Sequence, residues 1–265
     1  MIPKRIHYCW LSNDPIPDKL CQCMASWKKL DGYEFILWNF DRFDINSSSW
    51  VKQAFEAKKY AFAADYIRLY AIYNYGGIYL DMDIEVIKPF EVSMLNTDLM
   101  MGIESRYSNW MEAGCFGAEK GHPFIKKVLE YHNRPFENSL VLPHVMYTIW
   151  QENFADIPHQ FYMPDVFTAK SFHTGLVKIT PNTYTVHHFA GTWNSEADRK
   201  YSLQRWAYFK RFGDGFFSFW FYMLTVVYPK SFISNFLWIW KHFRKEGCTK
   251  TIKHYFKKYV LRRND

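Results

Sequence analysis

Hydrophobic and polar residues alternate with a period of two in the stretch IYLDMDIEV, residues 78–86. This is the pattern of a half-buried β-strand, in which successive side chains point to opposite faces of the sheet. Asp81 and Asp83 are therefore expected on one face, with Cα atoms roughly 6.5–7 Å apart. Carboxylates at that spacing can take separate roles, in which one binds a divalent metal and the other grips a ligand hydroxyl. A solvated acidic edge strand would show the same pattern, and D-x-D alone is a common sequence.

The segment before this strand has the period of a helix, predicted over residues 49–75. Apolar residues recur at helical spacing, and a Gly-Gly pair follows as a C-terminal stop. Asp65 and Arg68 lie three positions apart and share one face of this helix. A simple intrahelical ion pair, typically worth a few tenths of a kcal/mol, would explain them. Because an acidic strand follows directly, the pair could instead line the same pocket.

The same patterns predict alternating strands and helices along the first half of the chain. The order is strand 5–11, helix 17–30, strand 33–39, helix 49–75 and strand 78–86, with further strands at 99–104, 114–118 and 184–189. Such alternation makes a mostly parallel sheet with helices on its faces, and ligands collect outside the carboxyl ends of the strands. Trp10, at the end of the first strand, and the two aspartates could meet there.

Composition fits one soluble enzyme domain with an unusual number of rings. The chain has 265 residues, of which 20% are aromatic, so some rings are expected at the surface or against a ligand, lipid or partner. The five cysteines are odd in number, and Cys21-x-Cys23 has neither redox nor zinc-binding spacing. These cysteines indicate a reducing compartment without disulfides.

The positive charge is concentrated near the end of the chain. Residues 241–263 hold nine Lys or Arg and one Glu, which gives +8, whereas the whole chain is +7 and Asp265 contributes −1. Residues 1–240 therefore sum to zero, and the charge belongs to the tail. Nucleic-acid binding would spread positive charge over a folded face, so no nucleic-acid partner is expected.

The basic tail also has an apolar stripe, formed by Ile252, Tyr255, Phe256, Tyr259 and Val260. A basic amphipathic helix with aromatic neighbours suits the surface of an anionic membrane. A helical subdomain packed on the core is the alternative. We expect a catalytic domain over residues 1–200 and a helical, basic and aromatic extension over 201–265. No signal peptide or membrane anchor is visible, which favours a bacterial cytoplasmic protein peripheral to the inner face of the cytoplasmic membrane.

Four ordered motifs resemble one known family. The stretch YAFAADYIRLYAIYNYGGIYLDMD, residues 60–83, resembles the signature of the DXD-containing sugar transferases of glycosyltransferase family 32, and it is similar to part of the large clostridial cytotoxin catalytic domains. IPKRIHYCWL (2–11), GAEKGHP (117–123) and HHFAGTW (187–193) resemble the family's first strand, middle motif and C-terminal motif. The resemblance implies a GT-A type, Rossmann-like nucleotide-sugar-binding domain.

The resemblance also implies residue roles on the donor. Trp10 matches the ring that stacks on the nucleotide base, and Tyr79 matches a nucleotide contact. Asp65 and Arg68 match residues that hold the donor sugar's hydroxyls and the departing phosphate side. Asp81 matches the residue that bridges ribose and sugar hydroxyls.

The implied metal is Mn²⁺ or Mg²⁺, with Asp83 as its direct ligand. Counting back from Trp193 favours His188 as a further metal or diphosphate ligand, but the strand register could select His187 instead. Trp193 would donate its indole N–H to the diphosphate. Glu112 could contact the acceptor or the donor.

The implied reaction is the metal-dependent, retaining transfer of a hexose from a nucleotide sugar, expected to be UDP-linked. The acceptor would be a saccharide or lipid-linked molecule in bacterial capsule or surface polysaccharide synthesis. The departing phosphate can take the acceptor's proton, so no dedicated base is named. A metal-dependent phosphohydrolase and a non-catalytic sugar- or lipid-binding module are the alternatives. A toxin that modifies host proteins is a further one, which the short chain and its basic tail disfavour.

Overall fold

The computed structural model describes residues 1–105, 108–139, 141–191 and 195–222. The chain divides into two compact units, Met1–Trp206 and Ala207–Asp265. The first unit contains the central sheet and the residues predicted for the site.

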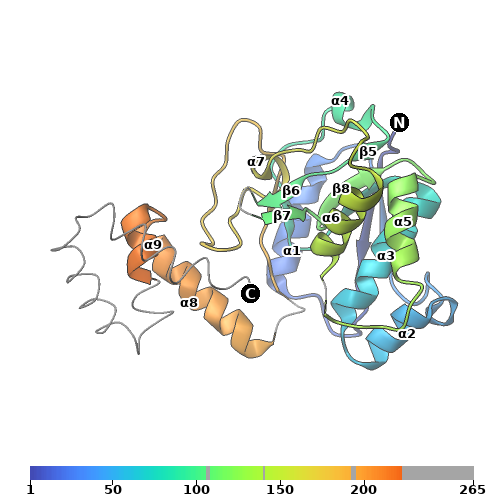
Figure 1. Cartoon of the computed structure of the whole chain (residues 1–265), viewed down its shortest axis with the longest axis horizontal. Helices are drawn as coiled ribbons and strands as arrows, with labels where there is room; N and C mark the ends of the chain where they lie inside the picture. Colours follow the sequence, from blue (N-terminus) through green and yellow to red (C-terminus); the bar gives the residue numbers. More distant parts are fainter. Residues whose placement is uncertain (106–107, 140, 192–194, 223–265) are drawn as a thin grey trace. The chain divides into compact units, whose positions relative to one another are not determined.

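A five-stranded sheet forms the centre of the first unit, with strand order β2-β1-β3-β8-β5 (Figure 1). The strands are β1 (Arg5–Cys9), β2 (Glu34–Trp38), β3 (Gly77–Leu80), β5 (Leu99–Met100) and β8 (Cys115–Ala118). β1 pairs parallel with β2 and β3, whereas β8 pairs antiparallel with β3 and β5. Four of these strands therefore run one way and β8 runs the other, which confirms the predicted mostly parallel sheet.

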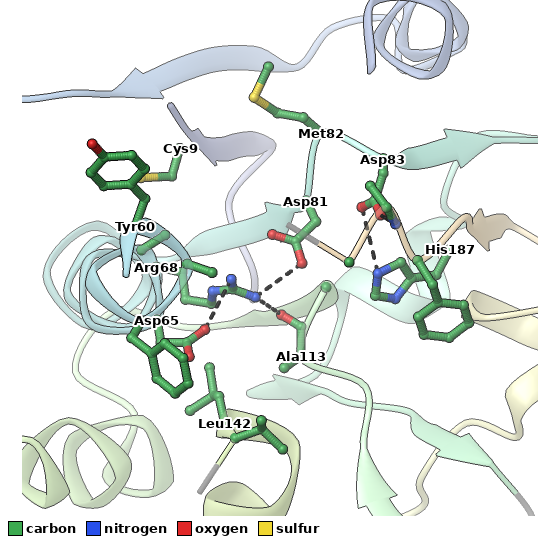
Figure 2. Close-up of a pocket in the computed structure, with 18 of the residues that line it drawn as sticks. Cys9, Tyr60, Asp65, Arg68, Asp81, Met82, Asp83, Ala113, Leu142 and His187 are labelled. Carbon is green, nitrogen blue, oxygen red and sulfur yellow. Dashed lines mark hydrogen bonds and ion pairs between the residues drawn. The ribbon is translucent and has the colours of Figure 1, made fainter. Parts of the chain in front are cut away.

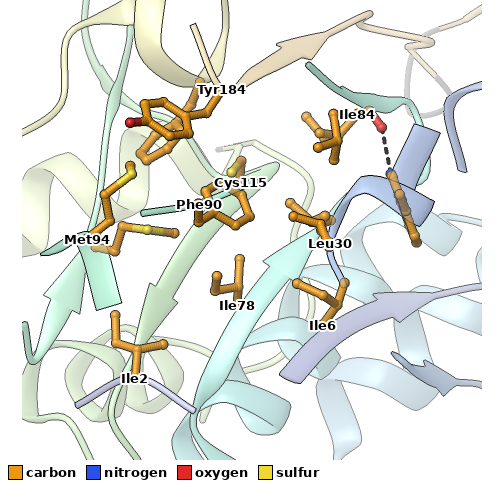
Figure 3. Packing of buried hydrophobic residues seen from close by; sticks show 14 of the residues in the cluster. Ile2, Ile6, Leu30, Ile78, Ile84, Phe90, Met94, Cys115 and Tyr184 are labelled. Carbon is orange, nitrogen blue, oxygen red and sulfur yellow. Dashed lines mark hydrogen bonds between the residues drawn. The ribbon is translucent and has the colours of Figure 1, made fainter. Parts of the chain in front are cut away.

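Helices cover both faces of this sheet. The helices of the first unit are α1 (Asp18–Ala25), α2 (Ser49–Glu56), α3 (Tyr60–Tyr75), α4 (Val92–Leu95), α5 (Pro123–Tyr131), α6 (Leu142–Asn153) and α7 (Pro164–Phe167), with 3-10 turns at Ser26–Lys29 and Ile45–Ser47. On one face Ile6, Ile78 and Leu80 pack with residues of α1 and the turn after it, in the cluster that Figure 3 shows. On the other, Tyr79 packs with residues of α3 and α5. β3 is consequently buried on both sides.

Two short antiparallel pairs complete the first unit. β4 (Ile84–Val86) pairs with β9 (Thr185–His187), and β6 (Ile103–Ser105) pairs with β7 (Ser108–Met111). The Trp27 indole N–H donates to the Ile84 carbonyl at 2.8 Å, which ties β4 to the turn after α1 (Figure 3). The pairing with β4 brings His187 close to the end of β3, which lies far earlier in the chain.

The strand predicted over residues 78–86 is interrupted, and this prediction was wrong in its middle. β3 ends at Leu80, and the Ile84 N–H donates to the Asp81 carbonyl at 2.9 Å, which makes residues 81–84 a turn. The physical reason is that β3 and β4 belong to different sheets, so the chain changes direction between them. Period-2 alternation cannot distinguish one strand from two strands joined by a short turn.

The helix predicted over residues 49–75 is also two helices. α2 ends at Glu56, and α3 begins at Tyr60 after Lys58, whose φ of 57° is left-handed. The Ser48 hydroxyl caps α2 by accepting from the Val51 N–H at 3.3 Å. The predicted stop is confirmed, since Gly76 follows α3 with φ of 63°.

The second unit is described only as far as residue 222. It contains the end of α8 (Glu196–Phe212) and α9 (Phe216–Tyr222). Tyr208 and Phe209 pack against Tyr222, with ring centroids 5.2 and 5.1 Å apart. Among the described residues of the whole chain, no helix has both the length and the apolar character needed to cross a membrane. The predicted amphipathic tail, residues 241–263, lies outside the described residues.

Candidate active site

Arg68 is the centre of a buried cluster of charges at the carboxyl ends of β1 and β3 (Figure 2). It projects from the inner face of α3, where helical spacing also places Asp65. Nη2 lies 3.1 Å from Asp65 Oδ1, and Nη1 lies 3.2 Å from Asp81 Oδ2 and donates to the Ala113 carbonyl at 2.8 Å. Arg68 therefore joins the helix, the end of β3 and the segment before β8. A lone intrahelical pair does not describe these contacts.

Asp81 is held from two sides by residues that the sequence singled out. Besides Arg68 on Oδ2, its Oδ1 accepts from the Tyr79 hydroxyl at 3.0 Å. The Arg68 guanidinium also lies over the Tyr79 ring, 4.6 Å from its centroid. Among the described residues, Arg68 and Tyr79 thus each bind one carboxylate oxygen of Asp81, and lone pairs are left for a ligand in the cavity.

The turn after β3 brings Asp83 to the other side of the site. Its Oδ2 accepts from the Ala190 N–H at 2.6 Å, and its Oδ1 lies 3.6 Å from His187 Nε2 (Figure 2). One ligand atom each from Asp81, Asp83 and His187 lies within 4.8 Å of the others, as a metal site requires. Two carboxylates and an imidazole are suitable donors for a divalent cation such as Mn²⁺. These residues therefore fit the implied metal.

The two adjacent histidines point to different partners. His187 faces Asp83, whereas His188 Nε2 lies 2.9 Å from Glu85 Oε2, outside the three-residue group. The geometry thus brings the predicted alternative, His187, to the carboxylates and does not bring His188, the residue favoured from sequence. The register of β9 sets this choice, because Ile84 pairs with His187. Metal binding by either histidine stays a prediction.

Glu112, which the sequence suggested only as an acceptor or donor contact, is a fully buried carboxylate beside His187. Its Oε1 lies 2.9 Å from His187 Nδ1 and accepts from the Gly114 N–H at 2.7 Å, while its Oε2 accepts from the Thr168 hydroxyl at 2.8 Å. Gly114 is packed so closely that a Cβ there would lie 2.8 Å from His187 Cε1 and 3.0 Å from Asp81 Oδ2. A glycine is required at this position for steric reasons.

One cavity of about 530 Å³ in the first unit is lined by Asp65, Arg68, Tyr79, Asp81, Asp83, Gly114 and His187. Trp10 also lines it, and its indole N–H donates to the Asp14 carbonyl at 3.1 Å. Phe189, which belongs to the predicted motif at 187–193, is a further lining residue, whereas sequence reasoning missed Glu104, Trp110 and Phe172. No local pattern marks them, because they come from separate short segments. Trp193 lies outside the described residues, so its predicted role is not placed.

The cavity is rich in carboxyl groups, and burial dominates their protonation. Burial raises the pKa of Asp65 to about 6, with Arg68 opposing this, and it also raises the pKa of Asp81. Burial and the nearby charge of Glu112 raise the pKa of Glu104 to about 8. An excess of desolvated carboxyls disfavours their ionisation together, and a bound cation would relieve this.

Glu112 and His187 each shift the pKa of the other, and the shift opposes the effect of burial on that pKa. Burial disfavours the charged form of each, but their mutual attraction and hydrogen bond outweigh it, so that the pKa of Glu112 is lowered and that of His187 is raised to about 10. Without a cation the pair is therefore an imidazolium and a carboxylate, and a cation bound at Nε2 would displace the proton from that nitrogen.

Comparison with known proteins finds similarity to sugar transferases over part of the chain. Residues 17–106 match the model of the glycosyltransferase sugar-binding region containing a DXD motif. The chain is similar to inositol phosphoceramide mannosyltransferase 3 of Schizosaccharomyces pombe, at 29% identity over 133 residues (48% of this chain and 36% of the relative). It is similar to inositol phosphoceramide mannosyltransferase 1 of the same yeast at 29% over 143 residues (50% and 42%). The chain spans less than half the length of these curated relatives.

Two solved structures have distant similarity to this fold. They are the PaToxG glycosyltransferase (TM-score 0.49, 20% identity, 58% of this chain and 70% of that one) and a glycosyltransferase involved in the glycosylation of the major capsid of PBCV-1 (TM-score 0.44, 16% identity, 76% and 98%). The mixed sheet with its covering helices fits a GT-A type fold. The matched region contains the stretch whose sequence resembles the DXD-containing sugar transferases, and the yeast relatives are similar to about half of this chain. The capsular type and the relation to the cytotoxins stay predictions.

Proposed function

We propose that this protein is a retaining, metal-dependent glycosyltransferase that moves a hexose from a nucleotide sugar to a saccharide or lipid-linked acceptor. The observation that carries this proposal is the convergence of Asp81, Asp83 and His187 opposite Arg68 in one cavity. A metal-binding face and a cationic face on either side of Asp81 suit a sugar diphosphate, which has negative phosphates next to neutral hydroxyls.

The residues of this chain orient the donor. Arg68 keeps Asp65 and Asp81 at its two ends, so that their free lone pairs can accept hydrogen bonds from sugar hydroxyls. Tyr79 fixes the second oxygen of Asp81. The Trp10 ring, held through its indole N–H, lines the cavity, and a nucleotide base can stack on it.

The chemical step needs little more than this arrangement. A divalent cation held by Asp83, His187 and Asp81 would supply positive charge that stabilises the diphosphate as it leaves the sugar. The acceptor hydroxyl attacks the sugar from the face that the diphosphate leaves. The C–O bond to the acceptor forms as the C–O bond to the diphosphate breaks. The departing phosphate oxygen takes the proton of the acceptor hydroxyl. No side chain is required as the base.

The yeast relatives support the choice of substrates. Their names describe mannosyltransferases of inositol phosphoceramide. Mannose is a hexose, and inositol phosphoceramide is a lipid. We propose UDP-linked hexoses as the first donors to test and GDP-linked hexoses as the second set. Among divalent cations, the imidazole of His187 favours Mn²⁺ over Mg²⁺.

A donor screen tests the proposal. The full chain is heated with each nucleotide sugar, with and without Mn²⁺, and we expect one donor to raise the melting temperature only when the metal is present. Donor at about 100 times its dissociation constant would stabilise the folded chain by about 2.7 kcal/mol. Hydrolysis of simple phosphoesters without binding of any nucleotide sugar would instead favour a phosphohydrolase, and inert binding would favour a non-catalytic module.

We further propose that the protein acts at the inner face of a bacterial cytoplasmic membrane, in the synthesis of a capsule or another surface polysaccharide. Support comes from the second unit, where aromatic side chains of α9 are exposed, including Phe217 at 86% and Phe216 at 58%. The sequence beyond it carries the +8 charge of residues 241–263. Exposed rings beside basic residues are typical of proteins that bind anionic lipid reversibly.

Membrane binding predicts a specific effect of two tail lysines. Lys257→Gln with Lys258→Gln should weaken co-sedimentation with phosphatidylserine vesicles about 30-fold at low salt, because each basic residue near an anionic surface contributes about 1 kcal/mol. The matched control is Lys126→Gln with Lys127→Gln, two exposed lysines on α5 in the first unit. Equal vesicle binding by the wild type, the tail variant and the α5 variant would rule out the membrane proposal.

A further inference from the structure

Glu112 is a buried carboxylate whose hydrogen bonds all lead to the segments that surround the candidate metal site. It has no exposed surface and follows β7 directly. Its two oxygens accept from a backbone N–H, a hydroxyl and an imidazole, at 2.7 to 2.9 Å. Three hydrogen bonds on one carboxylate fix its position.

The three donors come from segments that are far apart in sequence. Gly114 precedes β8, Thr168 follows α7, and His187 ends β9. Thr168 holds both members of the pair, because its hydroxyl donates to Glu112 and its carbonyl accepts from the His187 N–H at 3.0 Å. The orientation of the His187 ring is thus determined by Glu112 and by the backbone at the same time.

We infer that Glu112 is the positioning residue of the metal site: it accepts the Nδ1–H of His187 and so leaves the Nε2 lone pair directed at the space shared with Asp81 and Asp83. This inference rests on the proposed function. A neutral imidazole has one N–H, and a carboxylate at Nδ1 determines which nitrogen carries it. Glu112 itself lies behind His187, and its hydrogen bonds go to His187, Gly114 and Thr168 rather than to either aspartate.

The close packing of Gly114 supports a built arrangement. Its absent Cβ leaves the space in which Glu112 Oε1, His187 Cε1 and Asp81 Oδ2 approach, at 2.9, 2.8 and 3.0 Å from the Cβ position. Glu112 binds the Gly114 N–H while the Gly114 carbonyl accepts from the Asp81 N–H at 2.8 Å. One residue therefore connects the positioning carboxylate to the backbone of a metal-site aspartate.

The test measures Mn²⁺ affinity by electron paramagnetic resonance, on the full chain alone and with uridine diphosphate. Glu112→Gln removes the charge, and Glu112→Asp keeps the charge but withdraws it by one methylene. We expect both to weaken Mn²⁺ binding about 10- to 100-fold, as loss of an outer partner of a ligating histidine does. Glu85→Gln is the matched control, because it removes a carboxylate that pairs with His188, whereas the hydrogen bond to His187 Nδ1 comes from Glu112.

A double-mutant cycle separates positioning from a general effect on structure. In a His187→Ala background, Glu112→Gln should cause no further loss of Mn²⁺ affinity, since Glu112 would act only through the imidazole. If Glu112→Gln does not fold, Glu112→Asp and Thr168→Val, which removes one donor to the carboxylate, give the same comparison.

The outcomes are distinct. Wild-type affinity in Glu112→Gln or Glu112→Asp, or an equal loss in Glu85→Gln, overturns the inference while the proposed function stands. Absence of Mn²⁺ binding by the wild-type chain in both conditions overturns the metal part of the proposed function, and the inference with it.

Discussion

Asp83→Asn is expected to reduce kcat/KM for sugar transfer by at least about 100-fold and to abolish metal-dependent donor binding. The asparagine keeps the size of the side chain and can still accept from the Ala190 N–H, so the turn is expected to hold. What it loses is the negative charge beside His187 Nε2, and a charged oxygen ligand contributes several kcal/mol to charge stabilisation. Mn²⁺ affinity and transfer kinetics measure the loss, and circular dichroism checks the fold.

Glu85→Gln is the matched control for this prediction. Glu85 lies two residues further along the chain and pairs with His188, and its carboxylate is outside the Asp81, Asp83 and His187 group. We expect near wild-type kinetics for it. Transfer by Asp83→Asn at the wild-type rate, or full wild-type activity in excess chelator, would contradict a metal role for Asp83.

The sequence predicted the parts of this site that lie in continuous elements. Helical spacing placed Asp65 and Arg68 on one face, and the structure shows them paired at 3.1 Å. The alternation of strands and helices placed Trp10 and Asp81 at the carboxyl ends of β1 and β3, and both line the cavity. Local periodicity contains this information because side-chain direction follows backbone geometry within an element.

The turn at residues 81–84 shows where periodicity fails. Alternation continues through Asp81, Met82 and Asp83, but the chain leaves one sheet and enters another there. The two carboxylates nevertheless come together, because the turn directs both of them towards His187. The predicted proximity of the aspartates thus has a different structural cause from the one that the pattern indicated.

Contacts between distant segments could not be predicted from any pattern in the chain. The choice between His187 and His188 depends on the register of β9 against β4, a strand from a remote part of the sequence. Glu112 and Thr168 meet His187 only after three separate segments have packed together. In each case the deciding partner is remote in sequence, and local propensity contains no information about it.

Arg68 gives the last pair of variants, because its contacts separate a donor-binding role from an ordinary ion pair. Arg68→Lys is expected to lower kcat/KM about 100-fold or more, since an ammonium group cannot reach Asp65, Asp81 and the Ala113 carbonyl with the planar geometry of guanidinium. Arg68→Ala should also lower the free energy of unfolding by about 3 kcal/mol, because it leaves the largely buried carboxylates of Asp65 and Asp81 without the cation that they share. Steady-state kinetics and urea unfolding measure the two effects.

Asp65→Asn tests the other member of the pair with Arg68, and the pKa of Asp65 predicts how activity depends on pH. Burial raises the pKa of Asp65 to about 6, so the folded protein takes up this proton as the pH falls through about 6, above the ordinary range of an aspartate. The wild-type kcat/KM should therefore decline below about pH 6 as the partner of Arg68 becomes neutral. Above that pH the ionised carboxylate of Asp65 lowers the stability of the folded protein, and Asp65→Asn removes this cost. We therefore expect Asp65→Asn to avoid the unfolding penalty of Arg68→Ala. Its kcat/KM should nevertheless fall about 100-fold, because a charged contact to the donor is lost. If both Arg68→Lys and Asp65→Asn have near-normal kinetics, the pair has only a structural role in α3.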